Sequence, residues 1–168
     1  MGVTIHYRER LRGPQDYEMF VQAVEMFTML HGWPTEIIPE AERTVERDHD
    51  DAKWRITGLT KGIVVQPHKD AEPLRFEFDA DLAMEDYCKT QFAGADTHVA
   101  VIELLRTVGR HCDLEVYDEA EVWETGDPER AVYHINELNE QLAELMARKP
   151  AARAKVRLPS GRIADLIE

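Results

Sequence analysis

The residues with the clearest chemical potential lie in the segment 113–127 (DLEVYDEAEVWETGD), which holds seven carboxylates and one tryptophan. Like charges on so short a segment destabilise a folded chain unless they point into water, meet cations or bind a ligand. If a strand runs through this segment, Leu114, Val116 and Asp118 share its apolar face, where an unpaired carboxylate is costly. We therefore expect a solvated acidic face with Asp118 at the strand end, and the alternative is a site for a hard cation such as Mg²⁺.

A second polar cluster, the segment 88–94 (CKTQFAG), precedes an expected helix start. Free backbone N–H groups and the positive end of the helix dipole favour an anion at such a place. An enzyme built here would use Lys89 to fix an anionic substrate, His98 as acid or base, and Asp118 to orient one of them or to hold Mg²⁺. The more common outcome is a polar loop, with His98 bonded to backbone. The same pocket would place five more side chains near a ligand: Thr90, Gln91, His68, Trp123 and Glu124.

Several common chemistries are excluded because their motifs are missing. Ser160 is the only serine and lies between proline and glycine, so a Ser-His-Asp nucleophile has no rigid turn to carry it. The chain has no Walker A loop, no G-x-G-x-x-G and no H-E-x-x-H. None of the seven histidines has a histidine partner at helical spacing, so a zinc site would need His68, His98 and an acid to meet through the fold. No motif identifies a cofactor.

Charge limits the choice of partners. The formal net charge of −13 at pH 7 makes nucleic acid an unfavourable partner, because phosphates would be repelled. Residues 113–146 carry eleven acids against Arg130 alone, whereas residues 147–162 carry six basic residues and no acid. We expect residues 1–148 to form a single domain and residues 149–168 to form a mobile basic tail. The cations of this tail could lie against an acidic face of the same chain or of a partner.

Periodicity predicts the elements that must position these residues. Val3–Leu11 alternates like a half-buried strand, and Gly13-Pro14 opens a helix that Gly32 ends. Further strands are expected at 41–48, 61–66, 74–78 and 114–118, helices from 96 or 97 and from 127, a charged turn at 48–53, and a short helix or irregular segment at 82–94. This order predicts an α+β fold, with a mainly antiparallel sheet and three helices packed on one face in a two-layer sandwich.

The sequence also predicts the cellular compartment and the oligomeric state of the protein. Cys88 and Cys112 lie far apart with no C-x-x-C, which predicts reduced thiols in a cytoplasmic protein. The first residues contain no apolar signal segment and no apolar run approaches about 18 residues, so we expect no membrane association. Met19, Met26 and Met29 give the first helix a second apolar surface, which predicts a homodimer seam.

Four segments resemble a group of uncharacterised bacterial proteins: HYRERL, QPHKDAEPLRFEFD, CKTQFAG and YDEAEVWETGD. The resemblance covers most of residues 1–130, with Arg10 and Lys69 standing where Gly and Pro are expected, and it leaves out the tail. It implies a bacterial, intracellular setting and brings no activity with it. We therefore predict a small cytoplasmic binding or protein-interaction module, and the alternative is a small-molecule enzyme whose pocket is formed by Cys88–Gln91, His98 and Asp118–Glu124.

Overall fold

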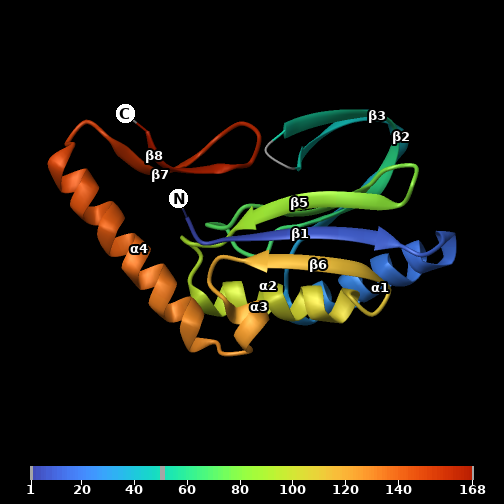
Figure 1. Ribbon diagram of the computed structural model, residues 1–168, viewed down its shortest axis with the longest axis horizontal. Helices are drawn as coiled ribbons and strands as arrows, with labels where there is room; N and C mark the ends of the chain where they lie inside the picture. The colour runs from blue at the N-terminus through green and yellow to red at the C-terminus, as the bar shows by residue number, and fades with distance from the viewer. Residues whose placement is uncertain (1, 50–51, 168) are drawn as a thin grey trace.

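The fold contains helices and antiparallel strands in a mixed order along the chain. A computed structural model describes residues 2–49 and 52–167 (Figure 1). Within these residues it has four helices and eight strands, so the predicted α+β class with antiparallel strands is confirmed. The elements are β1 (Thr4–Leu11), α1 (Pro14–His31), β2 (Thr35–His49), β3 (Ala52–Val65), β4 (Leu74–Phe78), β5 (Ala83–Lys89), α2 (Ala95–Val108), β6 (Cys112–Asp118), α3 (Val122–Thr125), α4 (Glu129–Arg148), β7 (Arg153–Arg157) and β8 (Ile163–Ile167).

The first sheet has the strand order β5-β1-β6, and β1 pairs antiparallel with both neighbours. Its inward residues follow the alternation expected from the sequence, since Ile5, Tyr7 and Leu11 are buried. They join the core with the apolar faces of α1 and α2, as Phe20 and Leu105 illustrate. Figure 1 shows both helices along one side of this sheet, with the β2–β3 and β7–β8 hairpins on the other. One side of the sheet is therefore core, and the other is open between two hairpins.

The second sheet has the order β2-β3-β4, and a short turn leads from β4 to β5. No ladder joins β4 to β5 among the described residues, but side chains bridge the junction. The Tyr7 hydroxyl donates to the Arg75 carbonyl at 2.9 Å and accepts from the Arg75 N–H at 3.0 Å. Arg47 donates to the carbonyls of Glu77 and Glu85. These bonds satisfy backbone groups that a continuous ladder would otherwise pair. The connectivity is that of a β-α-β-β-α-β motif with the β2–β3 hairpin inserted after α1.

The centre of the core is a cluster of aromatic rings. Phe20 of α1 meets Phe76 and Phe78 of β4 edge to face, each with ring centroids 5.1 Å apart. Gly62 of β3 permits this close approach of β3 and β4, because a Cβ there would lie 1.7 Å from the Phe76 carbonyl oxygen. At the end of α1, Gly32 has a left-handed conformation with φ of 67°, which confirms its predicted role as helix cap.

Three regions differ from the sequence prediction. The segment 82–94 was predicted as a short helix or irregular, but Ala83–Lys89 within it forms β5, because these residues pair with β1 along seven positions. The strands predicted at 41–48 and 61–66 are parts of the longer β2 and β3, and the predicted turn at 48–53 includes residues 50 and 51, which lie outside the described residues. A four-residue helix, α3, follows β6 in place of further strand.

The basic C-terminal segment folds back onto the chain. β7 and β8 form a hairpin, and Arg157 donates to the carbonyls of Lys69 and Ala71. Lys155 lies 3.1 Å from Asp70, so basic side chains of this segment meet acids and carbonyls of their own chain. Of α4, only Ala131 and Ile135 are buried, and the helix spans the distance between the sheet and the hairpin (Figure 1). No helix among the described residues is long and apolar enough to cross a membrane.

Candidate functional site

The structure brings His98 and Asp118 together, as the sequence suggested, but inside the core. His98 Nε2 lies 3.0 Å from Asp118 Oδ1, although off the line of an ideal hydrogen bond, and Nδ1 lies 2.6 Å from the Thr90 hydroxyl. The side chains of His98 and Asp118 are 0% exposed, and Thr90 is also fully buried. This chain of contacts links the segment after β5, the first turn of α2 and the end of β6. A substrate has no access to it, so its evident role is to hold the three elements together.

Asp118 is held by backbone donors as well as by His98. Its carboxylate accepts hydrogen bonds from the N–H groups of Ala120, Val122 and Trp123 at 2.8, 2.8 and 3.1 Å. Burial raises the pKa of Asp118, but His98 and these N–H donors outweigh burial and keep the pKa below its ordinary value. The carboxylate therefore stays charged and closes the turn into α3. This arrangement occupies oxygens that a Mg²⁺ ion would need.

Lys89 points away from this buried chain. Its Nζ donates to the Ile163 carbonyl at 2.9 Å and to Asp165 Oδ1 at 2.8 Å, both on β8. Successive residues of an extended segment point to opposite faces, so Lys89 and Thr90 cannot serve one pocket. Gln91 is also buried, where it accepts from the Val3 N–H and donates to Asn139 of α4. The expected joint cleft of Lys89, His98 and Asp118 is therefore not formed.

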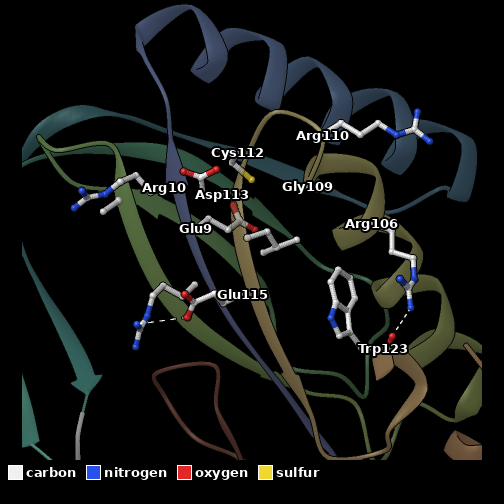
Figure 2. Close-up of a pocket in the computed structure, with 12 residues that line it drawn as sticks. Glu9, Arg10, Arg106, Gly109, Arg110, Cys112, Asp113, Glu115 and Trp123 are labelled. Atoms are coloured by element: carbon white, nitrogen blue, oxygen red, sulfur yellow. Dashed lines mark hydrogen bonds and ion pairs between the residues drawn. The ribbon is translucent and has the colours of Figure 1, made fainter. Parts of the chain in front are cut away.

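The remaining predicted ligand-binding residues lie apart from one another. His68 is in the loop before β4, where its Nδ1 accepts a hydrogen bond from the Asp70 N–H. Trp123 is partly buried and its ring lies under the Arg106 guanidinium at 4.5 Å, while Arg106 also donates to the Trp123 carbonyl (Figure 2). Glu124 is exposed on α3. Trp123 thus anchors α3 against α2.

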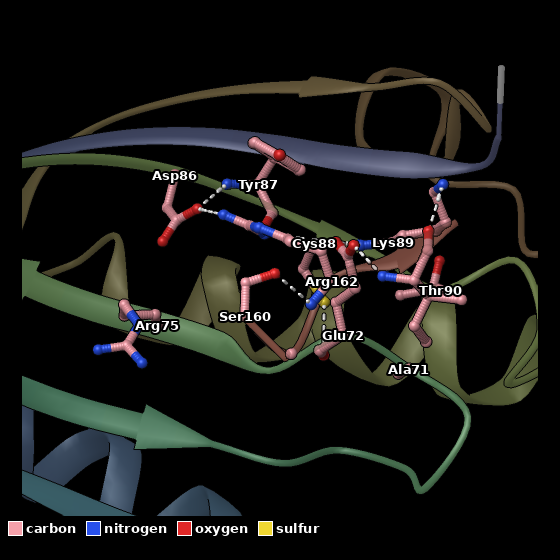
Figure 3. A network of polar contacts seen from close by, with 12 residues as sticks. Ala71, Glu72, Arg75, Asp86, Tyr87, Cys88, Lys89, Thr90, Ser160 and Arg162 are labelled. Carbon is pink, nitrogen blue, oxygen red and sulfur yellow. Dashed lines mark hydrogen bonds and ion pairs between the residues drawn. The ribbon is translucent and has the colours of Figure 1, made fainter. Parts of the chain in front are cut away.

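A dense polar network attaches the C-terminal hairpin to β5. Buried Glu72 accepts hydrogen bonds from the N–H groups of Lys89 and Ile163 and forms an ion pair with Arg162 at 3.3 Å. Arg162 also contacts Asp86 at 2.5 Å and donates to the Tyr87 carbonyl, as Figure 3 shows around its central guanidinium. The hairpin is therefore held in place mainly by charges and hydrogen bonds.

A groove of about 780 Å³ lies on the open side of the β5-β1-β6 sheet. Its floor consists of outward-facing side chains from all three strands, and its rims are Glu46 and Lys53 of the β2–β3 hairpin and Ser160 and Arg162 beside β8. Cations and anions alternate along it, and Arg8 lies 3.4 Å from Glu85. The groove is a shaped polar surface.

An aromatic row crosses the floor of this groove. His6 of β1 is the cross-strand neighbour of Tyr87 on β5 and of Tyr117 on β6, with ring centroids 5.8 and 5.7 Å apart. Tyr117 is 64% exposed, and the Arg162 guanidinium stacks on Tyr87 at 3.7 Å. This row was not predicted from the sequence. Its only signal was that each ring stands at a solvent-facing position of its strand, and strand neighbours are needed to see that the rings meet.

Metal and thiol chemistry find little support in this geometry. No group of three or more His, Cys, Asp or Glu side chains among the described residues could hold a metal ion. Cys88 and Cys112 are free and buried. Burial raises the pKa of both thiols, that of Cys112 to about 12. Neither cysteine has the environment of a reactive thiolate.

Comparison with known proteins adds no identity: no family model, no curated protein and no solved structure matches this chain. This is in keeping with the resemblance to proteins without a known activity. The fold and the site define the class as an α+β protein with a buried Thr90–His98–Asp118 chain and an open aromatic groove.

Proposed function

We propose that this protein is a small cytoplasmic binding module whose ligand lies in the groove above the β5-β1-β6 sheet. The observation that carries the proposal is the row of His6, Tyr87 and Tyr117 on the groove floor. Aromatic rings bind planar ligands by stacking, and a row of rings on an open sheet face offers such a platform. The stacked Arg162 leaves His6 and Tyr117 as the open part of the platform.

The chemistry of the rims favours an uncharged planar heterocycle. Arg8, Lys53 and Arg162 stand beside Glu46 and Glu85, so a ligand edge meets donors and acceptors of both signs. A polyanion such as nucleic acid is disfavoured by the net charge of −13. A small heteroaromatic ring with polar substituents, such as a nucleobase or a similar compound, fits both the stacking platform and the mixed charges.

The proposal is tested with adenosine as the probe and ribose as the matched compound without the ring. Adenosine is expected to shift the amide signals of His6, Tyr87 and Tyr117 in a ¹⁵N NMR titration, whereas ribose should leave them in place. Tyr117→Ala should weaken adenosine binding at least about fivefold, because stacking contributes about 1–3 kcal/mol per base. Tyr133→Ala is the control, since Tyr133 is a similarly exposed tyrosine (56%) on α4. Equal affinities of the two variants, or no shift with adenosine, would contradict the proposal.

The enzymatic alternative has less support from the positions of its residues. His98 and Asp118 have no exposed side-chain surface, and Lys89 is paired with Asp165. A general acid or base must come within hydrogen-bond reach of its substrate, which this burial prevents. The same contacts explain His98 and Asp118 as buried parts of the fold and Lys89 as an attachment of β8 to β5.

The binding module is also expected to form a homodimer through α1. Met19, Met26, Met29 and Leu30 are all exposed on this helix, the last two at 76% and 80%, and a second copy would cover the same residues on both chains. Light scattering should therefore give twice the chain mass of 19.4 kDa. Met26→Glu should return the mass to that of one chain, because a charge in an apolar seam is costly. Leu145→Glu, at an exposed apolar position of α4, serves as control; a single-chain mass for the wild type would remove the dimer.

A further inference from the structure

Glu9 stands out as a buried acid that has no hydrogen-bond partner among the residues that the structure describes. Among the described residues four acids are buried: Glu9, Glu72, Glu77 and Asp118. The last three each accept hydrogen bonds, Glu77 for example from the Thr60 hydroxyl at 2.7 Å. Glu9 is 1% exposed, and neither of its carboxyl oxygens has a hydrogen-bond partner. Native proteins rarely leave such a group unsatisfied, so this one calls for an explanation.

The position of Glu9 in the sheet makes its lack of a hydrogen-bond partner still more unusual. It occupies an inward position of the central strand β1, where Ile5, Tyr7 and Leu11 on the same face are core residues. Its cross-strand neighbours are the apolar Met84 and Leu114. An apolar residue would pack there at no electrostatic cost. A carboxyl group at this position has hydrogen-bonding capacity that none of the described residues uses.

Glu9 also lines a cavity of about 940 Å³ at the edge where β6 meets α2. In Figure 2 it lies between the flank that carries Arg10 and Glu115 and the flank that carries Arg106, Arg110 and Trp123. Gly109 forms part of the α2 wall, where a Cβ would approach a Leu114 methyl group to 3.0 Å. The glycine therefore keeps this wall free of a side chain next to the strand.

The mouth of this cavity on the α2 side is cationic. Arg106 and Arg110 both line it and both are exposed. Arg106 is held in place, because its guanidinium stacks on the Trp123 ring and donates to the Trp123 carbonyl at 2.6 Å. A positioned guanidinium is well suited to a carboxylate or phosphate group.

We propose that this cavity is a second ligand site. A small ligand displaces the side chains that cover Glu9 at the cavity wall and donates a hydrogen bond to Glu9 from an ammonium, amide or hydroxyl group, while Arg106 and Arg110 hold its anionic end. The ligand class is thus a small amphoteric acid of the amino-acid type. A donor group supplies the partner that both Glu9 oxygens lack, and the anion complements the two arginines. The site differs from the aromatic groove in the residues that bind the ligand. Glu9, Arg106 and Arg110 line this cavity and not the groove, although Arg8 and Glu115 line both.

The test uses ω-amino acids of increasing length, from glycine to 6-aminohexanoate, with butyrate and butylamine as half-probes. In ¹⁵N NMR titrations at least one amino acid should shift the signals of Glu9, Gly109 and the Trp123 indole. It should bind at least about tenfold more tightly than either half-probe, because each half-probe lacks one of the two anchors.

Two variants separate this site from non-specific anion binding. Glu9→Met and Arg110→Ala should each weaken binding of that amino acid at least about tenfold, whereas Glu103→Gln, an exposed acid elsewhere on α2, should leave it unchanged. Shifts that butyrate alone reproduces and that persist in Glu9→Met would overturn the role of Glu9. The site as a whole is overturned if none of the amino acids shifts these signals.

Discussion

Asp118→Ala is expected to lower the free energy of unfolding by about 3–5 kcal/mol, because each buried donor that loses its acceptor costs about 1–3 kcal/mol. The alanine leaves three backbone N–H groups at the start of α3 without an acceptor and leaves buried His98 without its carboxylate. Urea unfolding followed by circular dichroism measures the change. Asp113→Ala on the same strand is the control, because the Asp113 side chain is 70% exposed and forms an ion pair with exposed Arg12.

The pH dependence of this loss follows from the lowered pKa of Asp118. A carboxylate with a folded-state pKa below its ordinary value of 3.8 stabilises the fold above that pH, and this contribution disappears as the pH falls through the folded-state pKa. The difference between wild type and Asp118→Ala should therefore shrink in strong acid. If Asp118→Ala costs no more than Asp113→Ala at neutral pH, the buried chain does not hold the elements together.

Glu9→Met is expected to raise the free energy of unfolding at neutral pH by about 1–3 kcal/mol, the cost of burying a polar group without a hydrogen-bond partner. The methionine would pack between Met84 and Leu114, and no unsatisfied oxygen would remain. Burial raises the pKa of Glu9 well above its ordinary value of 4.5. The folded chain then keeps this proton at a pH where the unfolded chain releases it.

The sign of the pH effect follows from that difference in proton binding. Below pH 4.5 the proton on Glu9 contributes to the stability of the folded wild type. This contribution is lost as the pH rises toward the folded-state pKa of Glu9. Glu9→Gln has no proton to lose, so its stability relative to wild type should rise from pH 4.5 to pH 8. Urea unfolding across this range measures it, with Glu115→Gln as the exposed control. A constant difference across the range would show that Glu9 has a partner in the folded protein.

The elements that depend on local periodicity were well predicted from the sequence. The alternation in Val3–Leu11 placed β1, and Gly32 placed the end of α1. Leu74–Phe78 was predicted with its exact bounds, because its apolar and polar residues alternate without interruption. In these stretches the residues that decide the backbone conformation lie next to one another along the chain.

β5 was missed because its sequence, AMEDYCK, has few residues that favour strands. It is a strand because β1 supplies the hydrogen-bonding partner, and that partner lies some eighty residues away. The C-terminal hairpin is similar, since Glu72 and Asp86 hold Arg162 across the same kind of separation. From composition alone this segment was predicted to be a mobile basic tail.

The residues of the candidate site show the same difference between what local sequence predicts and what long-range packing decides. Residue types pointed to His98 and Asp118, and the structure places them in contact, but only tertiary packing decided that both are buried and that Lys89 faces β8. The aromatic row and the unpartnered Glu9 arise from strands and helices brought together by the fold. Residue spacing along the chain sets local backbone conformation, whereas burial and side-chain neighbours depend on long-range packing, which a single sequence read in order does not contain.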